Sequence, residues 1–317
     1  MNTLYIVVPC YNEEECLDDS ALVLKEKMEE MINKELISSE SRILFTNDGS
    51  KDKTWEVIRR LHNENKLFQG LSLSRNRGHQ NACYAGLEYA VNYADMLITI
   101  DADLQDDPNS IINMVEKYNE GYEVVYGVRS SRKKDSFLKR FTAEGYYKLL
   151  RKMGVDIVYN HADYRLMSKR AVLELLKFKE VNLFLRGMVP QIGFKNTIVE
   201  YERLKRTKGE SKYTLKKMLA LAWNGITSFS VKPLKAITSL GFFITFLSVL
   251  AFIAFSVLFG IKVLDFTLVA YAIMSIWLAT GLILIGMGVL GEYIGKIHQE
   301  VKARPRYGID EILNDEK

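Results

Sequence analysis

The sequence has few cysteine, proline and histidine residues, and these shortages exclude several classes of protein. Its 317 residues include three Cys, five Pro and four His, with 48% AVILMFWYC, so it is neither collagen-like nor disordered. The cysteines are odd in number and form no C-x-x-C pair, which favours reduced cytosolic thiols over disulfides or zinc. The histidines lack metal-ligand spacing, and no G-x-x-x-x-G-K-[ST] segment occurs, so a P-loop is excluded. The net charge is only +4, and we expect no nucleic-acid partner.

Charge is absent from two long stretches. Residues 236–261 and 266–291 are uncharged, and each run has 26 residues. At about 1.5 Å per residue, each would form a helix of roughly 39 Å, longer than the roughly 30 Å of a hydrocarbon core. A buried hairpin in a soluble core is the alternative, but we expect two transmembrane helices. The connection between the runs is too short for an outer domain, so both long ends should lie on one side.

Basic residues beside these runs indicate the orientation. Between Glu200 and Lys235 there are nine basic and three acidic residues, and more Lys and Arg follow the second run. Because basic loops stay on the cytoplasmic side, we expect a multi-pass protein of the cytoplasmic (inner) membrane with its body and both termini in the cytoplasm. The apolar stretch 4–8 is too short for the core of a signal peptide.

The rest of the chain alternates strand and helix patterns. Short apolar runs predict strands at 4–8, 43–45, 69–73, 96–100 and 123–127. Helix patterns lie between them, at 17–36, 53–64, 81–93 and 108–118. This alternation indicates an α/β fold with a mostly parallel sheet covered on both faces. Ligands of such sheets bind beyond the carboxyl ends of the strands, where candidate site residues should therefore be sought.

Polar side chains follow four of the predicted strands. The segments are Pro9-Cys10-Tyr11-Asn12-Glu13, Asn47-Asp48-Gly49-Ser50, Arg75-Asn76-Arg77-Gly78 and Asp101-Ala102-Asp103-Leu104-Gln105. Each alone is compatible with an ordinary turn or helix cap. Because all four stand at strand ends, together they favour one functional rim.

Two carboxylates after the fourth strand are the most specific indication of function. Asp101 and Asp103, with the Gln105 amide, offer hard oxygen ligands suited to Mg²⁺ or Mn²⁺ bridging a diphosphate. Such an ion would neutralise charge on a departing nucleoside diphosphate. Asp106 and Asp107 directly precede a proline, and we assign them to turn or helix-cap positions instead.

These segments together resemble the family 2 inverting glycosyltransferases with a GT-A fold. The resemblance is to membrane-attached polyprenyl-phosphate glycosyltransferases, related to dolichyl-phosphate mannose synthase and the bacterial undecaprenyl-phosphate glucosyltransferases. It also rests on Asp163 followed by Arg165-Leu166, on Arg206-x-x-Gly209-x-Ser211-Lys212-Tyr213 and on the two uncharged runs, and it covers essentially the whole chain. One departure is Asn47, where many relatives carry an Asp.

The resemblance implies roles for individual residues. Asp101, Asp103 and Gln105 would hold Mg²⁺ or Mn²⁺, and Arg129 and Arg140 would lie near the phosphates. The residues expected to bind the nucleotide of a UDP-sugar are Pro9, Tyr11, Asn12, Glu13, Asp48 and Asp101. The residues expected to take part in catalysis are Asp103, Arg129, Asp163 and Lys212.

An acceptor at the membrane is expected from the basic residues that stand beside apolar-faced helical patterns. Such clusters suit anionic headgroups at an interface. Gly209 and Ser211 beside Lys212 suggest a loop that closes over a phosphate, whereas Lys216 and Lys217 fit general attraction to lipid. The residues expected to bind the acceptor phosphate are Arg129, Arg140, Arg206, Ser211 and Lys212. Because a phosphate monoester is already largely ionised at neutral pH, we expect Asp163 to orient a hydroxyl or a cation and not to take a proton.

We therefore expect a metal-dependent inverting glycosyltransferase that moves glucose or N-acetylglucosamine from a UDP-sugar to undecaprenyl phosphate at the cytoplasmic membrane face. One alternative is a membrane glycosyltransferase acting on a phosphate-free lipid such as diacylglycerol. Another is a non-enzymatic membrane protein that only binds nucleotide sugar.

Four regions follow from these expectations. A catalytic domain at 1–205 precedes an acceptor loop and juxtamembrane amphipathic helix at 206–235, a transmembrane hairpin at 236–291 and a cytosolic tail at 292–317. Small residues permit close contact between membrane helices, and they recur at Gly281, Gly286, Gly288, Gly291 and Gly295. We expect a homo-oligomer packed through these helices.

Overall fold

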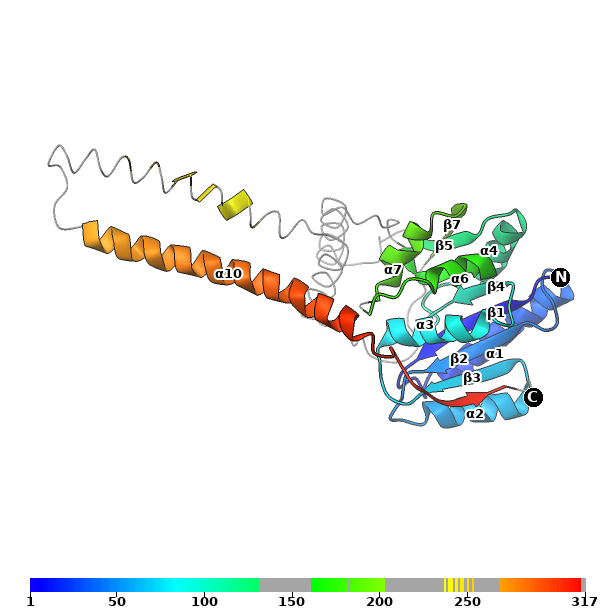
Figure 1. Cartoon of the computed structure of the whole chain (residues 1–317). Helices are drawn as coiled ribbons and strands as arrows, with labels where there is room; N and C mark the ends of the chain where they lie inside the picture. Colours follow the sequence, from blue (N-terminus) through cyan, green and yellow to red (C-terminus); the bar gives the residue numbers. More distant parts are fainter. Residues whose placement is uncertain are drawn as a thin grey trace.

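The computed structural model describes residues 1–130, 161–181, 183–202 and 268–314, with isolated helical residues between 237 and 253. Within these parts, an eight-stranded sheet forms the centre of the body, and one long helix extends away from it (Figure 1). The strands are β1 (Leu4–Cys10), β2 (Arg42–Asn47), β3 (Phe68–Leu73), β4 (Met96–Thr99), β5 (Val124–Arg129), β6 (His161–Ser168), β7 (Asn196–Tyr201) and β8 (Ile309–Leu313). The helices are α1 (Leu17–Asn33), α2 (Thr54–Glu64), α3 (His79–Ala90), α4 (Ser110–Asn119), α6 (Lys169–Leu175), α7 (Leu185–Met188), the 3₁₀ helix η1 (Val189–Ile192) and α10 (Leu268–Lys302).

The strand order is β7-β5-β6-β4-β1-β2-β3-β8. β1 is parallel to both β2 and β4, β2 is parallel to β3, and β5 is parallel to β7. β6 is antiparallel to its neighbours β4 and β5, and β8 is antiparallel to β3. The mostly parallel α/β sheet is therefore confirmed, and the five strands and four helices expected before residue 130 are present with ends shifted by a few residues.

Alternating side chains divide the core into two layers. Leu4, Ile6 and Val8 of β1 pack with α1, α2 and α4, whereas Tyr5 and Val7 pack with α3 and α6 on the other face. α1 shows why its sequence forms a helix, because its fully buried residues recur at helical spacing; they are Leu17, Ala21, Leu24, Met28 and Met31. Helices thus cover both faces of the sheet.

The C-terminal residues differ from the expected separate tail. α10 continues without a break past Glu292, and Ile309–Leu313 then pairs with β3 as the last strand of the sheet. Leu313 packs against the core layer that contains α1 and α2. The physical reason is that β3 would otherwise present an open row of backbone donors and acceptors at the edge of the sheet.

α10 is the membrane candidate. Its 35 residues would span roughly 52 Å at about 1.5 Å per residue. Ala279–Lys302 has the length and mean hydropathy of a membrane span, and none of it is buried in the body. The first uncharged run lies outside the described residues except for its isolated helical positions, and the juxtamembrane segment 206–235 lies wholly outside them.

The contact of α3 with the sheet leaves no room for a side chain at Gly86. The Cβ added by Gly86→Ala would lie 2.4 Å from Val7 Cγ1 and 2.5 Å from Thr46 Oγ1. Both neighbours are β-branched and cannot rotate away easily, so we expect a loss of about 1–3 kcal/mol in the free energy of unfolding and a lower Tm in thermal melts. Leu22→Ala, at an exposed position of α1, is the control and should change stability by no more than about 0.5 kcal/mol. An unchanged Tm for Gly86→Ala would contradict this close packing.

Candidate active site

The loops after β1 and β2 are fastened to each other at the carboxyl edge of the sheet. The Asn12 N–H donates to Ser50 Oγ at 3.0 Å, and the Lys51 N–H donates to Asn12 Oδ1 at 2.9 Å. The Glu13 N–H donates to Thr54 Oγ1 at 2.9 Å. Asn12 has a φ of 54°, a conformation that Asn tolerates better than most residues. These bonds fix the backbone on which three predicted nucleotide-binding residues stand.

The predicted nucleotide-binding residues near β1 are not equally accessible. Tyr11, Asn12 and Glu13 are half-buried in the loop, whereas Pro9 is buried within β1. Asn47, at the position where many relatives carry an Asp, is also buried. Its Nδ2 donates to Ser72 Oγ at 2.9 Å, so this side chain links the ends of β2 and β3.

Asp48 holds the loop that follows β3. Its two carboxylate oxygens accept the N–H groups of Arg77 at 2.6 Å and Gly78 at 2.8 Å. Burial raises the pKa of this carboxyl, and the two N–H donors oppose the rise. The neighbouring Gly49 has a φ of 59°, and a Cβ there would lie 2.5 Å from the Arg75 backbone. Asp48 and Gly49 therefore bring the loops after β2 and β3 into direct contact.

The predicted metal ligands follow β4 in a tight loop. The Gln105 N–H and Nε2 donate to the two oxygens of Asp103 at 3.3 Å and 3.1 Å. Leu104 has a φ of 43°, which is unusual for a residue with a branched side chain and marks local backbone strain. The loop thus turns back on itself, and Asp101, Asp103 and Gln105 stay close along the chain.

The charge around Asp101 suits a divalent cation. The Asp101 carboxylate is partly exposed, but the protein packed around it raises its pKa to about 6; His79 opposes this rise, and the carboxylates of Asp106, Asp163 and Asp103 add to it. A Mg²⁺ or Mn²⁺ ion would relieve this concentration of negative charge, and carboxylate and amide oxygens are ligands that both ions accept. Among the described residues, no three His, Cys, Asp or Glu side chains already form a metal-binding cluster. The two carboxylates with the Gln105 amide stay the predicted ligands.

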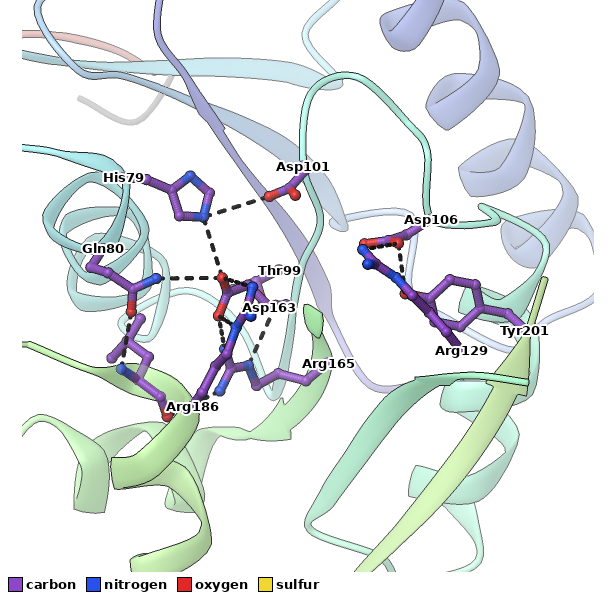
Figure 2. A network of polar contacts seen from close by, with 11 residues as sticks. His79, Gln80, Thr99, Asp101, Asp106, Arg129, Asp163, Arg165, Arg186 and Tyr201 are labelled. Carbon is purple, nitrogen blue, oxygen red and sulfur yellow. Dashed lines mark hydrogen bonds and ion pairs between the residues drawn. The ribbon is translucent and has the colours of Figure 1, made fainter. Parts of the chain in front are cut away.

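Asp163 lies beside this loop at the centre of a charged network (Figure 2). Arg186 of α7 donates through Nε to Oδ1 at 3.1 Å and through Nη2 to Oδ2 at 2.9 Å. Arg165 Nη2 donates to Oδ1 at 2.8 Å, and Gln80 Nε2 donates to Oδ2 at 3.4 Å. His79 Nε2 lies 3.8 Å from Asp163 Oδ2 and 3.5 Å from Asp101 Oδ1. Through His79, the network reaches the predicted metal ligands.

This network keeps Asp163 ionised. Burial disfavours the charged form, but Arg186, Arg165 and His79 outweigh it and hold the pKa of the carboxyl well below its ordinary range. A carboxylate held in this way is a poor proton acceptor at neutral pH. Its geometry instead suits the orientation of neighbouring cations.

A second network contains Arg129, which the family resemblance predicts to lie near the phosphates. Arg129 Nη2 lies 3.1 Å from Asp106 Oδ1, and the Tyr201 hydroxyl donates to the same oxygen at 2.6 Å. The expected turn or helix-cap role of Asp106 is wrong, because its buried carboxylate pairs with side chains from β5 and β7. Asp107 does form a turn, since its Oδ1 accepts the N–H of Asn109 at 3.0 Å.

Several polar residues of the site carry little signal in the sequence. Arg186 comes from a four-residue helix, and Gln80 lies in the first turn of α3. Arg165 has one detectable signal, since an arginine inside an apolar strand needs a buried partner. Four predicted acceptor-binding residues, Arg140, Arg206, Ser211 and Lys212, lie outside the described residues.

Comparisons with known proteins agree on the family. The family model described as glycosyl transferase family 2 matches residues 5–176. The chain is 52% identical over 316 residues to the uncharacterized glycosyltransferase YkoT of Bacillus subtilis, covering 99% of this chain and 93% of that protein. It is 40% identical over 306 residues to the bactoprenol glucosyl transferase of Shigella phage SfX, covering 95% of this chain and 97% of that protein.

Among solved structures, the chain is similar to glucosyl-3-phosphoglycerate synthase from Mycobacterium tuberculosis in complex with Mn²⁺, UDP and glucosyl-3-phosphoglycerate. The identity is 15% and the TM-score 0.43, over 71% of this chain and 78% of that chain. This likeness is distant, and the family assignment rests on the family model and the sequence relatives. On those two findings, the chain belongs to glycosyl transferase family 2.

Proposed function

We propose that this chain transfers a hexose, glucose ahead of N-acetylglucosamine, from a UDP-sugar to a polyprenyl phosphate such as undecaprenyl phosphate at the cytoplasmic membrane face. The observation that carries the proposal is the 40% identity, over nearly the whole length of both chains, to a protein named bactoprenol glucosyl transferase. The apolar exposed helix α10 supports a lipid-borne acceptor, because transfer to a soluble acceptor needs no membrane anchor. The name of that relative favours glucose.

The proposed membrane unit is a two-helix hairpin at 236–291, with the catalytic body and both termini on the cytoplasmic side. The described residues between 237 and 253 are helical, and Phe243 and Phe246 among them are exposed. A Cβ added at Gly286 of α10 would lie 3.5 Å from Ile237 Cγ2, so the two segments approach each other there. A homo-oligomer packed through these helices remains part of the proposal.

Asp101, Asp103 and Gln105 are proposed to hold Mg²⁺ or Mn²⁺. When bound, such an ion would neutralise the charge of the departing diphosphate. The loop hydrogen bonds from Gln105 to Asp103 keep these two side chains together. The loops that carry Tyr11, Asn12, Glu13 and Asp48 are proposed to bind the nucleotide.

The acceptor phosphate needs cations more than it needs a base. Its second pKa is about 6, so it is largely dianionic at neutral pH and attacks the anomeric carbon without losing a proton. Lys212, Arg206, Ser211 and Arg140 are proposed to hold it. Arg129 is the described member of this set, and its guanidinium donates to the Tyr201 hydroxyl and to the Asp106 carboxylate. In-line attack opposite the leaving UDP gives inversion.

The experiment that tests the function uses the full chain in proteoliposomes. Radiolabelled UDP-glucose is supplied with undecaprenyl phosphate or with diacylglycerol, and the lipids are separated by thin-layer chromatography. We expect label only in the undecaprenyl phosphate product. Label in diacylglycerol, or no labelled lipid with either UDP-glucose or UDP-N-acetylglucosamine, would overturn the proposal.

Asp103→Asn tests the metal site. The variant should fold, because the side chain stands on a partly exposed loop, but its turnover should fall by about two to three orders of magnitude through weaker stabilisation of the leaving group. Asp107→Asn is the matched control, since the amide oxygen can still accept from the Asn109 N–H, and its turnover should stay near wild type. Full wild-type activity in EDTA would refute metal dependence.

Asp163→Asn tests the proposal that Asp163 does not act as a general base. The depressed pKa of Asp163 places its titration far below that of the phosphate, so kcat/KM for the lipid should rise with pH through about 6 in the wild type. The variant should lose rate but keep this midpoint, which pH-rate profiles measure after thermal melts confirm folding. Loss of the midpoint in the variant would identify Asp163 as the base.

Lys212→Ala tests the cation proposed to hold the acceptor phosphate. The KM for undecaprenyl phosphate should rise at least tenfold, while the Kd for UDP in calorimetry stays within about twofold, because only the acceptor loses a charge-assisted contact. Lys216→Ala removes a nearby charge assigned to general lipid attraction and should change the acceptor KM much less. Equal effects of the two substitutions would remove the special role of Lys212.

A further inference from the structure

The chain between α10 and β8 is bonded to the body at several points. Residues 300–308, here called the junction, leave the end of α10 and run beside α3 toward β8 (Figure 1). The Glu300 carboxylate accepts the Val181 N–H at 2.7 Å, and Arg306 Nη2 donates to the Phe178 carbonyl at 2.8 Å. Both partners lie in the segment that leads into α7, the helix that carries Arg186.

The same junction contacts α3 and the end of β3. The Arg306 guanidinium stacks over the Tyr84 ring at 4.3 Å, and the Tyr307 hydroxyl bonds to Glu88. The Gly308 carbonyl accepts the Ser74 N–H at 2.9 Å. Ser74 directly precedes the loop that Asp48 holds, and α3 begins with His79 and Gln80.

The junction therefore contacts α3, which carries His79 and Gln80, and two segments that lead directly into other parts of the site. Six extended residues, 303–308, would span up to roughly 20 Å, so an unbonded connection would let the body shift by many ångströms against α10. The bonds remove that freedom. An acceptor phosphate held at a membrane surface has a fixed height, and a misplacement of about 1 Å between reacting groups can cost about a hundredfold in rate.

We propose that the junction sets the height of the active site above the membrane, with Glu300 and Arg306 as positioning residues. The inference rests on the proposed function. It predicts that the junction matters for an acceptor anchored in a bilayer and not for the same reacting phosphate on a short, water-soluble chain.

The test compares two acceptors with the full-length double variant Glu300→Ala/Arg306→Ala in proteoliposomes. One acceptor is undecaprenyl phosphate in the bilayer, and the other is a ten-carbon isoprenyl phosphate in solution. We expect the ratio of the two rates, bilayer over soluble, to fall at least tenfold, while the rate with the soluble acceptor and the Kd for UDP stay within twofold of wild type. Arg306→Gln, which keeps most of the side chain, is the second variant if the double variant does not fold, with the same direction of change expected.

Glu311→Gln is the matched control. Glu311 lies on β8 and bonds to Trp55 and Arg59 of α2, and neither of these two residues belongs to the candidate site. Its rate ratio should match wild type. Parallel loss of both rates in the junction variants, an unchanged ratio, or an equal fall in Glu311→Gln would overturn the inference. A wild-type protein that glycosylates neither phosphate would instead overturn the proposed function. The wild-type measurement alone therefore tests the function, and the variants test the inference.

Discussion

One buried carboxylate paired with two guanidiniums organises the polar side of this site. Arg165 is 1% exposed, so its charge is stable there only beside Asp163. Arg186 of α7 is the second guanidinium that binds this carboxylate. Gln80 of α3 donates to the same carboxylate through its Nε2, and its Oε1 accepts the Leu185 N–H. Because removal of one member would leave a buried charge unpaired, β6, α3 and α7 are held in one arrangement. His79 lies between Asp163 and Asp101, so the position of this charged network also affects the surroundings of Asp101.

The loops near the start of the chain are ordered by a different interaction. Side chains of one loop bond to the backbone of the next, as Asn12 does with Lys51 and Asp48 does with Gly78. Such bonds satisfy backbone groups that a loop cannot pair with itself. Different interactions thus hold the two halves of the rim in place. Hydrogen bonds to the backbone order the loops proposed to bind the nucleotide, and charge pairs order the part proposed for sugar transfer. Under the proposed function, a soluble donor and a lipid acceptor would approach this rim from two phases.

Sequence patterns predict the first half of the fold well, because strands that alternate with helices have strong local periodicity. They also predict that the polar segments share one edge of the sheet, because neighbouring parallel strands end there; the functions of these segments stay predictions. They do not predict that β6 lies between β4 and β5, since strand order depends on contacts distant in the chain. The sequence pattern also gives the wrong role for Asp106: next to Asp107 it resembles a turn residue, and only contacts distant in the chain, with Arg129 and Tyr201, show its pairing. The pattern does not predict β8, because this strand is short and lacks regular alternation of apolar residues.

The place of β8 in the sheet has a consequence for biosynthesis. Ribosomes make β3 before α10 and β8 after it, so the edge of β3 stays open while α10 is made. An open edge is a template for pairing with other chains. A nascent chain therefore completes the sheet only after all of α10 has been synthesised. Until then the body lacks its last strand and is exposed to aggregation and to proteolysis by quality-control enzymes, so that the finished sheet marks a chain in which α10 has already been made.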